Sequence, residues 1–145
     1  GYLIPRREGR AILGTLWDSS IFPERAPEGN VLLRSMMGGA TNPAAIDLSE
    51  AEVRSRVAAE LKTIMGIDAA PDFVRIFRHQ RAIPQYTVGH SRRLQAIDEH
   101  LGKVRGLFLT GNAFSGIGIN DCVNAAQQVA KRVVDFLGDE GRREA

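Results

Sequence analysis

Glycine and small polar residues follow a short apolar run at 107–110. They form a loop containing Gly111, Gly116 and Gly118, and a helical pattern begins near Asn120. Glycine lets the backbone turn tightly and approach a ligand closely, and the first turn of a helix carries N–H groups that have no partner inside the helix. These residues therefore predict a loop that binds an anion or the polar edge of a ring. The loop does not spell G-x-G-x-x-G, so a simple structural turn between a strand and a helix is the alternative.

Other side chains near this loop could also carry chemistry. Asp121 would be stabilised at the start of a helix by the helix dipole, or it could accept a hydrogen bond from a cofactor hydroxyl. Cys122 is the single cysteine, which excludes an internal disulfide and a multi-thiolate metal site, and we interpret it as a small buried thiol. The histidines, at positions 79, 90 and 100, are dispersed, so no metal site is predicted. We assign no residue as a catalytic acid or base.

The N-terminal part of the chain predicts an antiparallel sheet with a covering helix. The expected strands, separated by turn-forming residues, are 2–4, 11–16 and 31–37. Ser49 followed by Glu52 predicts a capping box, from which a helix with one apolar face runs to Gly66 and covers the sheet. Alternating side chains at 72–81 predict a further strand that returns to the meander.

The C-terminal part predicts a helix, a buried strand and a second long helix. These elements are expected at 91–104, 107–110 and 120–137. The strand is apolar on both faces, as in parallel sheets with helices on each side, yet the sequence contains no second strand of this kind. We therefore expect its neighbours to lie in another part of a longer protein, and residues after Gly138 to be frayed. The predicted fold class is α/β, or α+β for the isolated piece.

Composition indicates an ordinary globular protein. Of the 145 residues, 43% are hydrophobic and 25% are charged, which allows one domain with a core. The 19 Lys and Arg nearly balance the 17 Asp and Glu, and no aromatic ladder is interleaved with the basic residues, so nucleic acid is not an expected partner. No apolar run is long enough to span a membrane, and the single cysteine suits a reducing compartment, so we expect a cytoplasmic protein.

Five segments occur together in one order along the chain. They are Gly1-Tyr-Leu-Ile-Pro5, Phe22-Pro-Glu-Arg-Ala-Pro-Glu-Gly29, Gly38-Gly39, Ile83-Pro-Gln-Tyr-Thr-Val-Gly-His90 and Gly111-Asn-Ala-Phe-Ser-Gly-Ile-Gly-Ile-Asn-Asp-Cys122. In this order they resemble the C-terminal part of the protoporphyrinogen oxidase family, within the wider group of flavin-dependent amine oxidases. The resemblance implies an FAD cofactor, an N-terminal dinucleotide fold, and a strand, loop and helix near the C terminus that close the flavin site.

The resemblance also implies roles for parts of this chain. The residues that would lie along the flavin are Gly111, Asn112, Gly116, Ile117, Gly118 and Ile119. Residues 1–86 would belong to the substrate-binding domain, 87–138 would be the C-terminal part of the FAD-binding domain, and 139–145 would be a frayed tail. The N-terminal half of the same chain would supply the rest of the site, so the fragment alone is expected to be inactive and not to hold FAD.

The implied full-length protein is an oxidase of haem biosynthesis. It would dehydrogenate protoporphyrinogen IX, or coproporphyrinogen III, with dioxygen as acceptor, and peripheral contact of this parent with a membrane stays open. The alternatives are another flavin amine oxidase or desaturase, and a non-catalytic binding module. Gln85 and Tyr86 would face the flavin, act as a hinge, or simply pack. Because the neighbours of 107–110 would be absent, the isolated chain is expected to self-associate.

Overall fold

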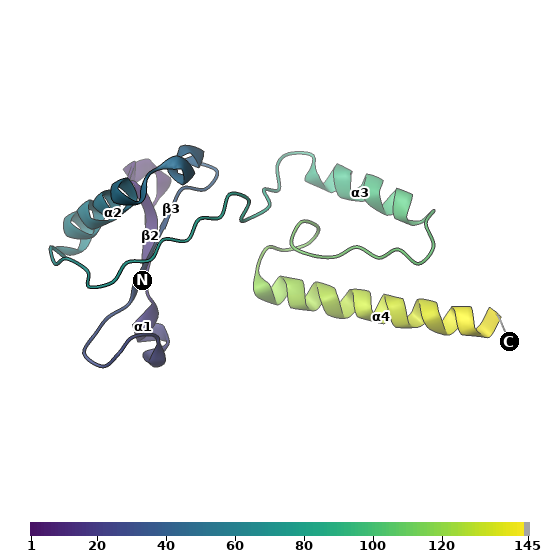
Figure 1. Ribbon diagram of the computed structural model, residues 1–145. Helices are drawn as coiled ribbons and strands as arrows, with labels where there is room; N and C mark the ends of the chain where they lie inside the picture. The colour runs from purple at the N-terminus through teal and green to yellow at the C-terminus, as the bar shows by residue number, and fades with distance from the viewer. Residues whose placement is uncertain (144–145) are drawn as a thin grey trace. The chain divides into compact units, whose positions relative to one another are not determined.

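The chain forms two compact units in the computed structural model, which describes residues 1–143 (Figure 1). The first, here called the sheet unit, is Gly1–Gln80, and the second, the loop unit, begins at Arg81. The division falls a few residues before the predicted boundary between 86 and 87. The assignment of these parts to a substrate-binding and an FAD-binding domain stays a prediction.

The sheet unit contains a three-stranded antiparallel sheet. Its strands, in the spatial order β1-β2-β3, are β1 (Tyr2–Leu3), β2 (Ile12–Trp17) and β3 (Leu33–Met37). A short helix, α1 (Asp18–Ile21), follows β2 before the chain returns to β3. Branched and aromatic residues, which suit a pleated sheet, recur along these strands. The predicted meander is confirmed.

One face of this sheet is well packed. Tyr2 lies opposite Thr15, which lies opposite Ser35, so the three side chains share a face. Thr15 is fully buried, and its hydroxyl lies 2.9 Å from that of Ser35. On the same face the rings of Tyr2 and Trp17 meet edge to face, with centroids 5.9 Å apart. This face forms part of the core.

The opposite face of the sheet is open and carries apolar side chains together with Arg34, which lies directly opposite Leu16 and is exposed. Leu3 lies opposite Gly14, which lies opposite Met36, and Leu16 is two residues further along β2. These side chains therefore project from the same face. Leu3 is 73% exposed, and Leu16 and Met36 are half-buried. We call Leu3, Leu16 and Met36 the open apolar face.

Helix α2 (Glu50–Met65) begins and ends at the residues that the sequence predicts. The Ser49 hydroxyl accepts a hydrogen bond from the Glu52 N–H at 3.3 Å, and the Glu52 carboxylate accepts one from the Ser49 N–H at 2.8 Å. Gly66 ends the helix in the left-handed conformation, with φ of 70°. The predicted capping box and C-terminal glycine are thus confirmed.

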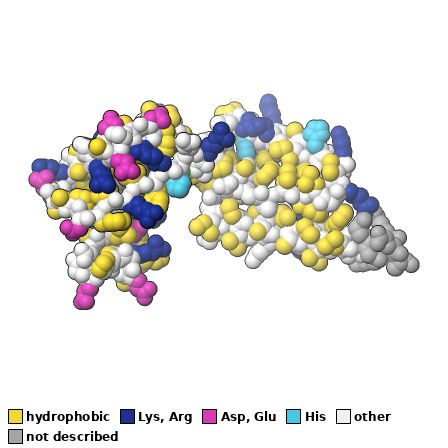
Figure 2. Space-filling view, viewed as in Figure 1, with side chains coloured by type: hydrophobic (Ala, Val, Ile, Leu, Met, Phe, Trp, Pro, Cys, Tyr) yellow, Lys and Arg dark blue, Asp and Glu magenta, His cyan; other side chains and the backbone are white. Residues whose placement is uncertain are grey.

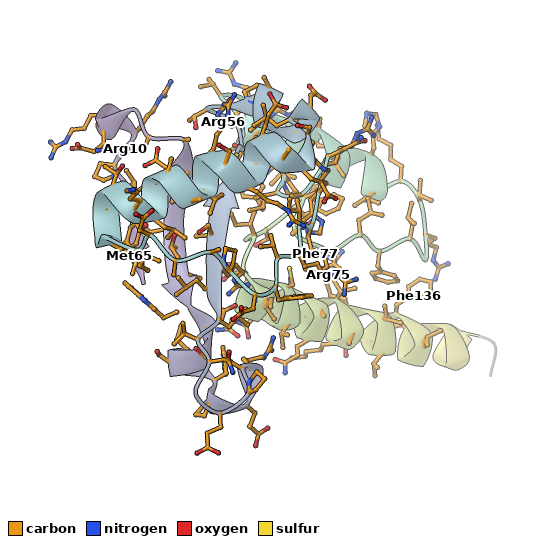
Figure 3. All side chains as sticks on the ribbon, turned by 60° about the vertical axis from the view of Figure 1, so that its left-hand side comes forward. Arg10, Arg56, Met65, Arg75, Phe77 and Phe136 are labelled. Atoms are coloured by element: carbon orange, nitrogen blue, oxygen red, sulfur yellow. The ribbon has the colours of Figure 1, made fainter. Side chains whose placement is uncertain are left out.

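Helix α2 lies beside the sheet and crosses the direction of the strands, as Figures 1 and 3 both show. Glu60 on α2 accepts a hydrogen bond from the Ala11 N–H, at 2.8 Å, just before β2 begins. Arg10 lies 3.7 Å from the same carboxylate. Ile12 on β2 and Ala45, in the turn before α2, are buried. The predicted cover of the sheet by this helix is confirmed.

The predicted strand at 72–81 does not form. Its side chains alternate as expected, since Val74 and Ile76 are half-buried whereas Phe73 and Phe77 are 74% and 68% exposed. However, the segment makes no ladder with any strand of the described residues. The prediction is wrong because alternation reports which side chains are buried, and a strand also needs a neighbour for its backbone hydrogen bonds.

A side chain anchors this segment in place of a ladder. The Arg78 guanidinium donates hydrogen bonds to the carbonyl oxygens of Ile46 and Leu48, both at 2.6 Å. Arg75 lies over the ring of Phe77, 5.0 Å from its centroid (Figure 3). The segment is therefore held at one point beside the start of α2.

The loop unit contains two helices. Helix α3 (His90–Leu101) confirms the helix predicted at 91–104, and α4 (Ile119–Arg143) confirms the one predicted at 120–137. Helix α4 continues through Gly138, so residues 139–143 of the predicted frayed tail are helical, and 144–145 lie outside the described residues. A glycine inside a helix costs about 1 kcal/mol and ends it only when the backbone turns left-handed, which Gly138 does not do.

Segment 107–110 is extended but has no paired strand among the described residues. Phe108 packs on Phe136 of α4, with ring centroids 5.8 Å apart at 73°. Leu107 and Leu109, on the other side, are 45% and 38% exposed. The predicted strand therefore lacks its ladder here, because a parallel strand is completed only by neighbouring strands.

Helix α4 carries two apolar stripes. The inner stripe is half-buried and consists of Cys122, Ala125, Val129, Val133 and Phe136. The outer stripe is exposed and consists of Ile119, Val123, Ala126, Ala130, Val134 and Leu137. Apolar atoms are visible on the surface of this unit in Figure 2.

Candidate functional site

The glycine-rich loop leaves the extended segment 107–110 and enters α4 through a tight turn. The Gly111 carbonyl accepts hydrogen bonds from the N–H groups of Phe114 and Ser115, at 3.0 and 3.4 Å. Gly111 and Gly116 have φ of 123° and 68°, values that residues with a side chain rarely adopt. The predicted loop and its need for glycine at these positions are confirmed.

Asp121 closes the loop onto the helix. Its Oδ2 accepts a hydrogen bond from the Gly118 N–H at 3.1 Å, and the Gly118 carbonyl accepts one from the Cys122 N–H at 3.0 Å. Gly118 is therefore the N-cap, and Asp121 is the third helical residue, the position whose carboxylate reaches back in a capping box. The predicted capping role is confirmed. Asp121 acts from the third position of the helix, whereas the first position was expected.

Backbone donors remain at the start of α4. No described residue accepts a hydrogen bond from the N–H groups of Ile117, Ile119 or Asn120. The Gly118 N–H, in contrast, is taken by Asp121. Ile119 and Asn120 are the first two residues of α4, so their N–H groups lie at the positive end of a long helix, and the Ile117 N–H lies just before it.

Tyr86 and His90 hold the other end of the loop. The Tyr86 hydroxyl donates a hydrogen bond to the Asn112 carbonyl at 2.6 Å, and the rings of Tyr86 and His90 stack with centroids 4.2 Å apart and planes at 8°. The sequence placed Tyr86 near the site but could not reveal this bond, because its partner lies 26 residues away. No hydrogen bond joins Gln85 to the loop; its amide donates to the Ile83 carbonyl at 3.0 Å.

An open cavity of about 430 Å³ borders the loop. It is lined by Arg81, Ala82, Ile83, Pro84 and Asn112. Its volume falls in the range of small-molecule sites, about 300 to 1,000 Å³. The cavity is thus lined by one positively charged side chain, Arg81, and by Asn112 near the beginning of the glycine-rich loop.

Cys122 is half-buried on the inner stripe of α4, with its sulfur 4.0 Å from the Gly116 carbonyl. This agrees with its interpretation as a small packing thiol. Within the described part of the chain, no three His, Cys, Asp or Glu side chains gather in a way that could hold a metal ion.

The class of protein is given by a family comparison, in which residues 4–134 match the family model of flavin-containing amine oxidoreductases. The chain belongs to this family. The match spans both units, from just after β1 to the middle of α4. Membership implies a flavin cofactor.

Curated relatives include porphyrinogen oxidases of two kinds. The chain is 33% identical over 138 residues to a coproporphyrinogen III oxidase from Bacillus subtilis, with 94% of this chain and 29% of the relative covered. It is 38% identical over 143 residues to the chloroplastic protoporphyrinogen oxidase of Oryza sativa, with 94% and 26% covered. It is 31% identical over 147 residues to the protoporphyrinogen oxidase of Homo sapiens, with 97% and 30% covered. The resemblance seen in the motifs is confirmed.

The chain spans only about 26–30% of the length of these relatives. Other relatives carry the names chloroplastic and mitochondrial protoporphyrinogen oxidase. Among the described residues, no helix combines the length and the apolar character needed to cross a membrane.

Proposed function

We propose that this chain completes the flavin site of an FAD-dependent oxidase, and that the full-length protein dehydrogenates a porphyrinogen with dioxygen as electron acceptor. The observation that carries the proposal is the start of α4, where the N–H groups of Ile117, Ile119 and Asn120 have no acceptor in the described chain. Membership of a flavin family and the names of the relatives support it. The cytoplasm is the proposed location, with peripheral membrane contact as a possibility for the parent alone.

The residues proposed to border the flavin are Gly111, Asn112, Gly116, Ile117, Gly118 and Ile119. Isoalloxazine carries oxygen and nitrogen acceptors along its pyrimidine edge, which the N–H groups at the helix start complement. Reduction adds negative charge near that edge, and a helix N-terminus contributes roughly half a positive charge. The bound flavin would accept a hydride from the substrate, and this chain would orient the flavin.

Asp121 favours the ring edge over the diphosphate as the group bound here. Its carboxylate already accepts the Gly118 N–H and places a negative charge inside the loop. A diphosphate is negatively charged in both redox states of the cofactor and would always meet like charge at this point, whereas the ring edge is neutral in the oxidised flavin. We therefore assign the FAD diphosphate to the remaining part of the full-length protein.

The open apolar face of the sheet is our candidate wall for the substrate. A porphyrinogen is a large ring with an apolar body, and Leu3, Leu16 and Met36 offer an apolar surface across three strands. Nothing else in the described sheet unit covers Leu3, which is 73% exposed. In this proposal the protein mainly orients the ring against the flavin, and no acid or base is required of these residues.

The test uses the full-length protein, purified with its cofactor. We expect a yellow protein whose denatured supernatant contains FAD, and which produces porphyrin fluorescence and hydrogen peroxide from coproporphyrinogen III or protoporphyrinogen IX. Each substrate is assayed separately, because relatives of both names match this chain.

The same purified protein distinguishes the proposal from two alternative functions. Oxidation of an amine, or desaturation of a substrate other than a porphyrinogen, without porphyrin fluorescence, would identify another flavin amine oxidase or desaturase. Tight porphyrin binding by calorimetry, in a protein that contains no flavin, would identify a non-catalytic binding module.

A further inference from the structure

Tyr86 joins two segments of the loop unit that are distant in sequence. Its hydroxyl donates to the Asn112 carbonyl at 2.6 Å, a short bond by the standard of O–H···O contacts. Asn112 is the second residue of the glycine-rich loop and also lines the cavity of about 430 Å³. The residues Arg81–Pro84, just before Tyr86, line the same cavity. The bond therefore ties the two walls of this cavity together.

The ring of Tyr86 is itself fixed before it meets the loop. The His90 ring stacks on it at 4.2 Å, and the His90 N–H donates to the Thr87 carbonyl at 3.0 Å. Arg93 on α3 donates to the Thr87 hydroxyl, also at 3.0 Å. The turn that carries Tyr86 is thus built onto the first residues of α3. Stacked and hydrogen-bonded in this way, the phenol has one orientation, and the Asn112 carbonyl is oriented with it.

The loop is consequently held by a side chain at each end. Tyr86 binds the carbonyl of Asn112 near its beginning, and Asp121 binds the N–H of Gly118 at its end. Between these anchors the loop has turn bonds to Gly111 and the weak contact of the Cys122 thiol with the Gly116 carbonyl. If the Asn112 carbonyl turned away, the Ala113 N–H would turn with it, because the two groups belong to one planar peptide unit.

We propose that Tyr86 is a positioning residue for the flavin, acting through Asn112, with His90 as its support. This inference rests on the proposed function, since it concerns the same site. Tyr86 touches no reacting atom; it sets the separation of the cavity walls and the direction of the Asn112 peptide against which the isoalloxazine edge lies.

The test is Tyr86→Phe in the full-length flavoprotein, which removes the hydroxyl and keeps the ring that stacks on His90. Loss of one such hydrogen bond is expected to weaken flavin binding about tenfold. It should also shift the visible absorption bands and the midpoint potential of the flavin, because the ring edge meets a reoriented peptide. His90→Ala, which removes the stacking partner, should shift the bands in the same direction and weaken binding several-fold.

Tyr2→Phe is the matched control. The Tyr2 hydroxyl is buried in the sheet unit and has no hydrogen-bond partner among the described residues. Its removal should leave the flavin bands, the potential and the flavin affinity unchanged. Should Tyr86→Phe and His90→Ala both keep the wild-type bands, potential and affinity while the wild type holds flavin, Tyr86 is only a packing residue. A wild-type protein that holds no flavin would instead overturn the proposed function.

Discussion

Gly116 is the position in the loop that tolerates a side chain least. Its φ is 68°, and a Cβ there would lie 2.2 Å from the Cβ of Asp121. We expect Gly116→Ala to displace Asp121, to break its bond to Gly118, and to destabilise the full-length protein by about 2–4 kcal/mol. Flavin retention, measured by visible absorbance after gel filtration, should fall with it.

Gly9→Ala separates the clash from the backbone strain. Gly9 has a nearly identical φ of 61°, but a Cβ there would meet no atom within 4 Å. This variant should cost only about 1–2 kcal/mol and should retain its flavin. Equal loss of flavin in both variants would show that the contact with Asp121 is unimportant.

For single residues, the sequence correctly predicted that the glycines form a tight loop. It predicted only in part which side chains contact that loop. A glycine cluster before a helix indicates a tight loop, because few other residues can adopt the positive φ angles that such a loop needs. The exact role of Asp121 depends on the residue at which α4 begins, and helix ends are defined only to within about one or two residues. The bond from Tyr86 to Asn112 depends on tertiary contact between distant segments, which no local pattern records.

The capping box of α2 should make that helix sensitive to acid. The Ser49 hydroxyl, and next the Ser49 backbone N–H, hold the pKa of Glu52 below its ordinary value of 4.5. Because the folded helix lowers this pKa, the contribution of the carboxylate is complete above pH 4.5 and is lost as the pH falls through the lowered value. In a peptide of residues 46–67, Glu52→Gln should reduce helicity at pH 7 by circular dichroism, and the difference from wild type should shrink on acidification.

Glu50→Gln in the same peptide is the control. Glu50 shares the first turn and the helix dipole but makes no capping hydrogen bond. Its effect should be smaller at neutral pH. An unchanged gap between the wild-type and Glu52→Gln peptides from pH 7 to pH 2 would contradict the role given to the carboxylate.

The tie between α2 and the sheet depends on the oxygen of Glu60 that accepts the Ala11 N–H at 2.8 Å. Glu60→Ala leaves that N–H without a partner, at a cost of about 1–3 kcal/mol, so its hydrogen exchange should accelerate roughly 10- to 100-fold. Glu60→Gln keeps an acceptor oxygen and loses only the charge near Arg10, so we expect a much smaller change. Nuclear magnetic resonance of the Ala11 amide measures both, and equal acceleration would favour the ion pair over the hydrogen bond.

Helices were predicted more accurately than strands, for a physical reason. The capping residues and the apolar stripe of α2 lie within one segment, so the sequence contains most of what that helix needs. Segments 72–81 and 107–110 show the side-chain pattern of strands but lack paired neighbours in the described residues. Periodicity predicts burial, and only the whole sheet determines hydrogen bonding.

At the scale of the molecule, the outer stripe of α4 should drive self-association of the isolated chain. Its exposed members include Ile119 at 83%, Val134 at 66% and Leu137 at 61%. An exposed, contiguous apolar surface of this kind tends to bind another apolar surface. Sedimentation velocity of the 145-residue chain should therefore show a mean mass that rises with concentration.

Val134→Lys places a charge in the stripe and should weaken this association about tenfold or more. Gln128→Lys adds the same charge to an exposed position of α4 outside the stripe, and should change little. A compact monomer at every concentration of the wild-type chain would refute the prediction.

The stretch 66–89, between α2 and α3, contains no helix or strand and includes the boundary between Gln80 and Arg81. Proteases cut most readily where exposed backbone is free of regular structure. Brief digestion with trypsin should thus cleave after the exposed Arg75 or Arg81, since the Arg78 guanidinium is engaged by the Ile46 and Leu48 carbonyls. One cut would separate the open apolar face, proposed to contact the porphyrinogen, from the glycine-rich loop, proposed to contact the flavin. The hydrogen bonds within each piece would remain.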